Sequence, residues 1–247
     1  MKYKLSVVSY LNTIPFIYGL QQSRLDKKLD ISLDIPSVCA EKLMTNKVDV
    51  GLVPIVVLKQ IQHAHIISDF CIGADGQVDT VCLFSDVPIN EIESIYLDYQ
   101  SKTSVELLKI LLTEYWKISP KLLESNANYE NQISGNTAGL IIGDRVFQHQ
   151  HKFKYVYDLS AIWKKHTGLP FVFACWIANK EIDKDFQKEF NNALKFGITN
   201  IEKAIKSATD IYSHCKNPLD YLNNKISYIL DAEKKKGMEL FLRKVGG

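Results

Sequence analysis

Short apolar segments alternate with segments of helical spacing along most of the chain. Apolar or alternating residues, typical of strands, occupy Leu5–Val8, Ile31–Ile35, Val50–Val53, Ile66–Ile67, Thr80–Phe84, Ser94–Leu97, Ala138–Ile142, Tyr155–Tyr157 and Phe171–Ile177. Helical runs separate many of them, at Pro15–Leu20, Ala40–Asn46, Val56–Gln62, Ser104–Trp116, Arg145–His149 and Ala161–His166. This alternation predicts an α/β fold with largely parallel sheets.

The pattern changes after Asn179, where apolar residues recur at helical spacing instead. Between Lys184 and about Ser207 these residues are Phe186, Phe190, Ala193, Leu194, Ile198 and Ile201. Two further helical stretches follow, around residues 218–224 and 232–245. An apolar stripe along a helix packs onto a neighbouring layer. We therefore expect a helical C-terminal region that covers the sheets.

The chain contains no low-complexity linker and no internal repeat, so two lobes would have to be joined by regular structure. The best candidates for crossing strands are the runs 78–85 and 170–179. Paired crossing strands form a hinge, with a ligand cleft between the lobes. We expect one lobe from residues 1–86 plus 174–247 and a second from residues 87–173, although composition alone also permits a single sheet.

Composition narrows the class of protein. The chain has 247 residues, of which 46% are hydrophobic and 23% charged, as in an ordinary globular protein. The net charge is +2 and only three residues are arginine, so nothing favours nucleic acid as a partner. No segment has the apolar length of a membrane span. The first residues lack the features of a signal peptide, which predicts a cytoplasmic protein.

The titratable side chains offer few familiar signatures. The five cysteines include no CxxC pair, and most lie in apolar runs where a reduced, buried thiol is expected. His63 and His65, like His149 and His151, lack an acidic or thiol partner at ligand spacing, so we expect no metal. GxSxG, Walker and GxGxxG motifs are all absent.

The first loop of interest follows the strand that ends at Val8. Ser9, Asn12 and Thr13 supply short donors and acceptors there, and Pro15 lies in the first turn of the next helical run. The free N–H groups at a helix start favour an anion. This loop is a candidate ligand site; an ordinary turn with an N-cap gives the same local pattern.

A second loop runs from Asp98 into the helical segment near residue 104. Thr103 and Glu106 have the T-x-x-E spacing of a capping box, with Thr103 as the N-cap. Ser101, Thr103 and Ser104 would then gather hydroxyls at the positive end of a helix dipole, which suits a carboxylate or phosphate. A well-capped helix without a ligand is the alternative.

Further strand ends also carry candidate residues. The strand Val50–Val53 ends at Pro54, and Thr80 begins another strand. The strand that ends at Ile142 is followed by Gly143 and Asp144, where a parallel strand presents residues to a ligand crevice. Asp144 is equally compatible with the role of N-cap of the next helix.

Taken together, these motifs resemble chorismate dehydratase of the futalosine route to menaquinone. The residues that carry the resemblance are Ser9-Tyr10-Leu11-Asn12-Thr13-Ile14-Pro15-Phe16, Val48-Asp49-Val50-Gly51-Leu52-Val53-Pro54, Thr103-Ser104-Val105 with Leu107-Leu108-Lys109, Ala138-Gly139-Leu140-Ile141-Ile142-Gly143-Asp144, and Trp163-x-x-x-Thr167-Gly168-Leu169-Pro170-Phe171-Val172-Phe173-Ala174-x-Trp176. They occur in family order, and the resemblance covers nearly the whole chain.

The resemblance implies a fold like the type II periplasmic binding proteins, with two α/β lobes joined by two crossing strands. It implies dehydration of chorismate to 3-[(1-carboxyvinyl)oxy]benzoate without a cofactor. The sister enzyme 1,4-dihydroxy-6-naphthoate synthase has a Cys-Pro-Asn-Asp type loop and a basic His where this chain has Ser9–Asn12 and Gly143-Asp144. A solute-binding protein with no catalytic activity is the remaining alternative. The chain is compatible with a monomer or a homodimer.

The expected mechanism uses the substrate's own enolpyruvyl carboxylate as the base. Asn12 cannot accept a proton near neutral pH, so we expect it to orient that carboxylate or the departing hydroxyl, with Asp144 as the reserve candidate for the base. The candidate substrate-binding residues are Ser9, Thr13, Pro54, Thr80, Ser101, Thr103, Ser104 and Gly143. Chorismate has two carboxylates, which these N–H and hydroxyl donors can bind through charge-assisted hydrogen bonds.

Overall fold

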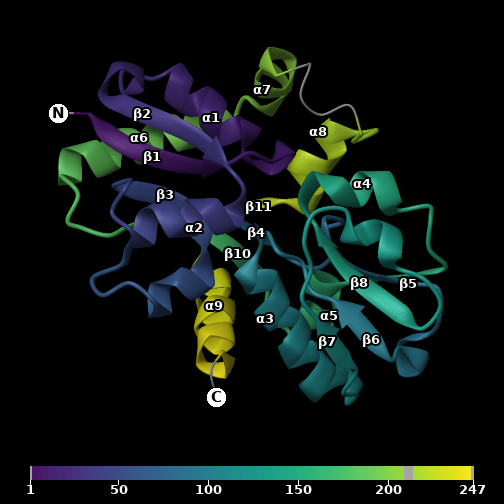
Figure 1. The fold of residues 1–247 in the computed structure, drawn as a ribbon. Coiled ribbons are helices and arrows are strands. Elements are labelled where there is room, and N and C mark those ends of the chain that lie inside the picture. The colour runs from purple at the N-terminus through teal and green to yellow at the C-terminus, as the bar shows by residue number, and fades with distance from the viewer. Residues whose placement is uncertain (1, 209–213, 246–247) are drawn as a thin grey trace.

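A computed structural model describes residues 2–208 and 214–245 and contains two β-sheets, each flanked by helices (Figure 1). The first sheet has the strand order β11-β4-β10-β3-β1-β2, and the second has the order β7-β6-β8-β5-β9. The strands are β1 (Tyr3–Val8), β2 (Leu29–Asp34), β3 (Val50–Pro54), β4 (His65–Ala74), β5 (Val81–Ser85), β6 (Ser94–Tyr96), β7 (Lys121–Leu123), β8 (Thr137–Ile142), β9 (Tyr155–Asp158), β10 (Phe171–Ala178) and β11 (Ser227–Ile229).

Helices follow most of the strands, as the alternating pattern predicts. They are α1 (Ile14–Gln21), α2 (Pro36–Met44), α3 (Lys102–Leu111), α4 (Val146–His149), α5 (Leu159–Thr167), α6 (Lys184–Ile198), α7 (Ile201–Ser207), α8 (Pro218–Asp220) and α9 (Ala232–Lys244). The run predicted as a helix at 56–62 is a 3₁₀ segment, Ile55–Lys59. Within the described ranges, no helix has the length and apolar character required to cross a membrane.

Both sheets are mixed rather than largely parallel. In the first sheet, β1 pairs in parallel with β2 and β3, and β10 runs antiparallel to β3 and β4. In the second, β6 pairs in parallel with β7 and β8, and β5 runs antiparallel to β8 and β9. Every residue of β3, β5 and β10 is buried, which is why these strands are continuous apolar runs.

The chain passes between the sheets twice. It leaves the first sheet at the end of β4 and enters the second at β5, and it returns after α5 to enter β10. The two passages are neighbours because Ala74 pairs with Phe171. We define the first lobe by the six-stranded sheet and the second lobe by the five-stranded sheet; the two lie side by side (Figure 1).

The sheet pairing differs from the predicted boundaries after residues 86 and 173. β5 lies upstream of the first boundary, yet it pairs with β8 and β9 of the second lobe. β10 begins upstream of the second boundary, at Phe171, and pairs with first-lobe strands. The change of sheet therefore falls within 75–80 and 168–170, in the segments that precede β5 and β10.

The C-terminal region is helical, as the apolar spacing predicts, but it also contains a strand that the pattern did not reveal. α6 packs along α1, where Gly19 and Gly197 allow the two backbones to approach closely. The short strand β11 pairs with β4 at the edge of the first sheet. β11 matters for the site because the hydroxyl of its Tyr228 reaches the loop after β1.

Candidate active site

A small cavity lies between the two lobes, at the carboxyl ends of their parallel strands. Parallel α/β sheets commonly bind ligands at this edge. The cavity volume is about 50 Å³, room for no more than a few water molecules. Its lining residues come from both lobes and from the segment that joins them: Val8, Tyr10, Asn12, Pro36, Pro54, Ile72, Val78, Thr80, Val81, Ser101, Ser104, Ile142, Gly143, Phe173 and Ala174.

The structure brings six of the predicted site residues into this lining, namely Asn12, Pro54, Thr80, Ser101, Ser104 and Gly143. Four others lie outside it: Ser9, Thr13, Thr103 and Asp144. The ten residues nevertheless converge on one region although they are distant in the chain, because the loops that follow β1, β3 and β8 and the start of α3 all meet at the gap between the sheets.

In the first-lobe loop, Thr13 and Asn12 serve different purposes. The Thr13 Oγ1 atom lies 2.6 Å from the Val8 carbonyl oxygen and 2.7 Å from that of Tyr10, so this hydroxyl is committed to the backbone of its own loop. The Tyr228 hydroxyl donates to the Asn12 carbonyl oxygen at 2.9 Å. The side-chain oxygen of Asn12 is buried and has no hydrogen-bond partner among the described residues. Asn12 is therefore held by its backbone and presents an unpaired side-chain oxygen.

The start of α3 differs from the predicted capping box. Ser101, and not Thr103, is the N-cap, and its Oγ accepts from the Ser104 N–H at 3.4 Å and from the Ser104 hydroxyl at 3.2 Å. The helix thus begins two residues earlier than the T-x-x-E spacing indicates, because Ser101 also satisfies the N-cap preference. Thr103 falls in the first turn, where its Oγ1 is buried without a partner in the described chain.

Gly143 and Tyr10 fit against each other across the cleft. The backbone of Gly143 is left-handed, with φ of 67°, which favours glycine. A Cβ atom at this position would lie only 2.6 Å from the Tyr10 ring. The hydroxyl of Tyr10 continues past Gly143 to donate to the side-chain oxygen of Gln100. The Tyr10 ring of the first lobe therefore packs directly against the backbone of Gly143 in the second lobe; we call this contact the Tyr10–Gly143 contact.

Next to the Tyr10–Gly143 contact, Asp144 forms a hydrogen bond between the two lobes. Its Oδ2 atom accepts a hydrogen bond from the Leu11 N–H at 2.9 Å. Its Oδ1 atom is buried and unpaired within the described residues. Burial raises the pKa of Asp144 to about 6, and the bond from Leu11 partly opposes the shift. The predicted alternative role of N-cap is not observed, since Arg145 occupies that position before α4.

The lining offers neutral donors rather than cations. No lysine or arginine is among the cavity residues of the described chain. The polar groups of the lining are the amide of Asn12, the hydroxyls of Thr80, Ser101 and Ser104, and the N-terminus of α3. The Ser104 hydroxyl already donates to Ser101, and that of Thr80 is bonded to Tyr221. Such groups bind anions through dipoles and hydrogen bonds. Across residues 2–208 and 214–245, no three His, Cys, Asp or Glu side chains are grouped as metal ligands.

Sequence reasoning missed the apolar part of the lining. Tyr10 belongs to a motif that we singled out, but its aromatic ring gave no polar signal. Phe173, Ile72 and Val78 lie in or beside strands, where an apolar residue indicates core packing. Thr80, which we did select, is held by the hydroxyl of Tyr221 at 2.9 Å. That C-terminal contact joins residues 141 positions apart, which no local pattern reveals.

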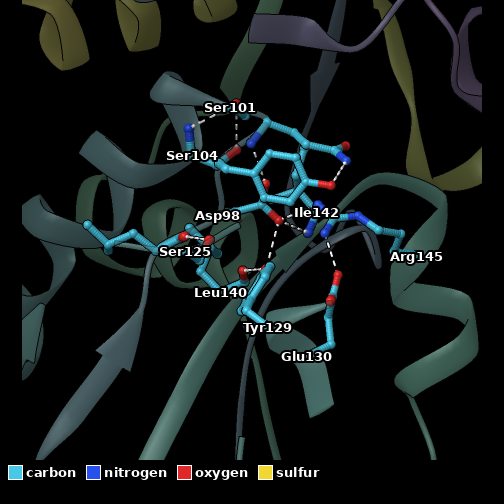
Figure 2. A network of polar contacts seen from close by, with 12 residues as sticks. Asp98, Ser101, Ser104, Ser125, Tyr129, Glu130, Leu140, Ile142 and Arg145 are labelled. Atoms are coloured by element: carbon cyan, nitrogen blue, oxygen red, sulfur yellow. Dashed lines mark hydrogen bonds and ion pairs between the residues drawn. The ribbon is translucent and has the colours of Figure 1, made fainter. Parts of the chain in front are cut away.

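A buried charge network lies behind the second-lobe wall (Figure 2). The Asp98 carboxylate accepts from the Gln100 N–H at 2.7 Å, the Tyr129 hydroxyl at 2.9 Å and the Ile142 N–H at 3.2 Å, and it also pairs with Arg145. The Arg145 guanidinium lies between Asp98 and Glu130, and it forms a second ion pair with Glu130. Burial raises the pKa of Asp98, and the positive charge of Arg145 opposes this shift.

Two mixed sheets with a cavity between their carboxyl edges define a two-lobed protein with a fold like that of the periplasmic binding proteins, which confirms the predicted fold class. A protein of Archaeoglobus fulgidus has a similar structure, with a TM-score of 0.74 at 14% identity over 98% of this chain and 96% of that one. So does a Candida albicans gene product described as having the generic periplasmic binding protein fold, with a TM-score of 0.65 at 12% identity, covering 98% and 90% of the two chains.

The sequence identifies the family within this class. The pattern of the family described as menaquinone biosynthesis matches residues 3–246. The chain therefore belongs to the menaquinone biosynthesis family, as its motifs predict. It is 27% identical to the chorismate dehydratase of Thermus thermophilus, and the match covers 99% of this chain and 95% of the relative.

Proposed function

We propose that the protein is a hydro-lyase that removes water from chorismate to give 3-[(1-carboxyvinyl)oxy]benzoate, the first step of the futalosine route to menaquinone. The observation that carries the proposal is the interlobe cavity itself. In a family of menaquinone biosynthesis, it presents an unpaired buried amide oxygen on Asn12 beside the hydroxyls of Ser101 and Ser104. The similarity to a chorismate dehydratase along almost the whole chain supports the same assignment.

The dehydration of chorismate requires few functional groups from the protein. Loss of water from chorismate breaks a ring C–H bond and a C–O bond, forms an aromatic ring and leaves the overall oxidation state unchanged. No electron acceptor is therefore required, and we propose that the enzyme works without a cofactor in the cytoplasm. Aromatisation supplies much of the driving force, so the protein has mainly to hold the geometry and allow proton transfer.

Asn12 is the residue that we assign to orientation. Its side chain lines the cavity and its backbone is fixed by Tyr228, so the amide can hold the enolpyruvyl carboxylate or the departing hydroxyl. The enolpyruvyl carboxylate itself would accept the ring proton. Asp144 is less suited to act as the base, because it lies outside the lining and one of its oxygens is already bound to Leu11.

Substrate binding requires the lobes to separate. A cavity of about 50 Å³ cannot contain a ten-carbon dicarboxylate, so the lobes must lie further apart in the complex than they do here. Closure after binding would exclude water and bring Ser101 and Ser104 against the ligand. Pro54, Thr80 and Gly143 would complete the surrounding wall. Ser9 and Thr13 would act through the shape of the first-lobe loop, since neither lines the cavity.

Incubation of the purified protein with chorismate tests the assignment. We expect chorismate to disappear and an aromatic product about 18 mass units lighter to form, since each turnover releases a molecule of water. Binding of chorismate without conversion would instead indicate a solute-binding protein. Conversion of a later pathway intermediate, with chorismate left intact, would indicate the sister activity of 1,4-dihydroxy-6-naphthoate synthase.

A further inference from the structure

Two hydrogen bonds from adjacent residues of the first lobe reach the second lobe. The Tyr10 hydroxyl donates to the Gln100 side chain, and the Leu11 N–H donates to Asp144 at 2.9 Å. The Tyr10 ring fills the notch above Gly143 between them. These contacts link the loop that carries Asn12 to both second-lobe loops of the cavity. They can form only while the lobes are closed, since each joins one lobe to the other.

Both receiving loops are anchored on one buried carboxylate. Asp98 Oδ1 accepts the Gln100 N–H at 2.7 Å, which fixes the loop leading to Ser101. Asp98 Oδ2 accepts the Ile142 N–H at 3.2 Å, which fixes the loop carrying Gly143 and Asp144. The Asp98 side chain has no exposed surface and lies behind the cavity wall, outside its lining.

We propose that Asp98 is a positioning residue. It holds the two second-lobe acceptors, Gln100 and Asp144, at the spacing that allows Tyr10 and Leu11 to bond to both of them when the lobes close. Asp98 does not contact the substrate in this arrangement. It acts through the loops that it aligns, and Arg145 neutralises its charge. The consequence for catalysis depends on the proposed dehydratase function, whereas the consequence for closure does not.

The chemistry of the network explains why an ionised carboxylate is required. Asp98 accepts hydrogen bonds from two backbone N–H groups and one guanidinium, and it also faces the Tyr129 hydroxyl, whose single proton is shared with the Leu140 carbonyl oxygen. An asparagine at this position has one oxygen and one NH₂ group. Its NH₂ group would face the donors of Ile142, Tyr129 and Arg145, or after rotation that of Gln100. At least one of the two second-lobe loops would therefore lose the acceptor that fixes its backbone.

The direct test is Asp98→Asn compared with Glu130→Gln. Glu130 is a matched control, because it is also a buried acid paired with Arg145 but is not bonded to Gln100 or Ile142. In Asp98→Asn we expect the Leu11 amide to exchange at least about tenfold faster with solvent deuterium. We also expect kcat/KM for chorismate to fall about 100-fold, as for a misplaced site. In Glu130→Gln, both should stay within about twofold of wild type even if Tm falls.

Two milder variants cover the case in which Asp98→Asn does not fold. Gln100→Met keeps the backbone bond to Asp98 but removes both the acceptor for Tyr10 and the Nε2 donor to the Tyr99 hydroxyl. Tyr10→Phe leaves the contact with Tyr99 in place and removes only the donor to Gln100. Each should accelerate Leu11 exchange, and the double variant should add little to either single one, because both remove the same bond. Each should also raise KM more than it lowers kcat.

Three results would overturn the proposal. One is wild-type protection of Leu11 in a folded Asp98→Asn protein. Another is equal acceleration in Glu130→Gln, which would indicate general destabilisation. The third is unchanged Leu11 exchange in both Gln100→Met and Tyr10→Phe. If the wild-type protein does not convert chorismate, the proposed function fails, but the exchange measurements still decide the role of Asp98.

Discussion

The two walls of the cavity are held in place by different kinds of contact. In the first-lobe wall, neutral groups bond to the backbone: Thr13 to its own loop and Tyr228 to the carbonyl of Asn12. In the second-lobe wall, a buried ion pair, Asp98 with Arg145, fixes the loops from behind. The first wall is thus anchored without charge, and the second is organised around charges that face away from the ligand.

This difference separates the groups that can bind a ligand from those that provide a frame. A buried polar atom without a partner costs about 1–3 kcal/mol, which a ligand can offset. Asn12 carries such an atom in the first wall, and Thr103 and Asp144 carry one each on the second-lobe side. A buried ion pair is expensive to desolvate, and its best-attested use is to fix geometry. We therefore expect substitutions at Asn12 to affect chemistry, and those behind the second wall to affect the arrangement of the site.

The largest expected effect distinguishes the two candidate catalytic residues. Asn12→Ala should lower kcat for chorismate consumption by about 10²–10³-fold, the usual loss when a preorganised hydrogen-bonding group is removed. Asp144→Ala should retain most of kcat and chiefly raise KM, because it weakens closure without removing a lining group. Steady-state rates of chorismate loss for both variants provide the measurement.

The opposite pattern would contradict the substrate-assisted mechanism. If Asp144→Ala is inactive while Asn12→Ala works almost normally, then Asp144 is the base. Asn12→Asp adds a useful control, since it keeps the shape of the side chain but introduces a negative charge beside an anionic substrate. We expect it to bind chorismate more weakly than Asn12→Ala does.

The second prediction concerns pH, because Asp144 is the group at the lobe interface with a pKa near neutrality. Its pKa is raised from 3.8 to about 6, so the folded state binds an extra proton between those pH values. The resulting stabilisation is complete below about pH 4 and is lost as the pH rises through 6. Asp144→Asn does not titrate and keeps an acceptor for Leu11. It should be more stable than wild type at pH 8, by at most about 3 kcal/mol, and show no gain at pH 4.

Urea unfolding at a series of pH values measures this difference. Asp183→Asn is a suitable control, since Asp183 caps α6 by accepting from the Phe186 N–H at 2.9 Å, and asparagine is an equally good N-cap. A constant offset between Asp144→Asn and wild type across the whole range would show that Asp144 does not titrate with the raised pKa.

The sequence was informative where local rules decide the outcome. Alternating runs predicted most strands, and polar residues at strand ends predicted that Asn12, Ser101 and Gly143 lie at a common edge. Local rules failed at the start of α3, because Ser101 and Thr103 both satisfy the N-cap preference and only the tertiary fold selects between them. They also failed for Asp98, because its partners Tyr129, Ile142 and Arg145 lie 31 to 47 positions further along the chain.

The third prediction tests the Tyr10–Gly143 contact between the two walls of the cavity. Gly143→Ala places a methyl group 2.6 Å from the Tyr10 ring and also strains a left-handed backbone. Gly135→Ala is matched to it, because Gly135 has a similar φ of 55° and nothing within 4 Å of the added Cβ. Both should lose about 1–2 kcal/mol of stability from the backbone strain. Only Gly143→Ala should also lower kcat/KM, by about tenfold for each 1.4 kcal/mol of impaired closure. An equal loss of activity in both variants would show that the ring contact is unimportant.

The smallest expected effect separates the two hydroxyls at the start of α3. Ser101→Ala removes the N-cap and should cost about 1 kcal/mol of stability, with a rise in KM because Ser101 lines the cavity. Thr103→Val is nearly isosteric and removes a buried hydroxyl that has no partner in the described chain. It should raise stability by about 1 kcal/mol. If Thr103 binds substrate in a more open state, as its position in the motif predicts, Thr103→Val will also raise KM. Thermal unfolding and KM for chorismate, measured on both variants, therefore decide whether the unpaired hydroxyl is reserved for the ligand.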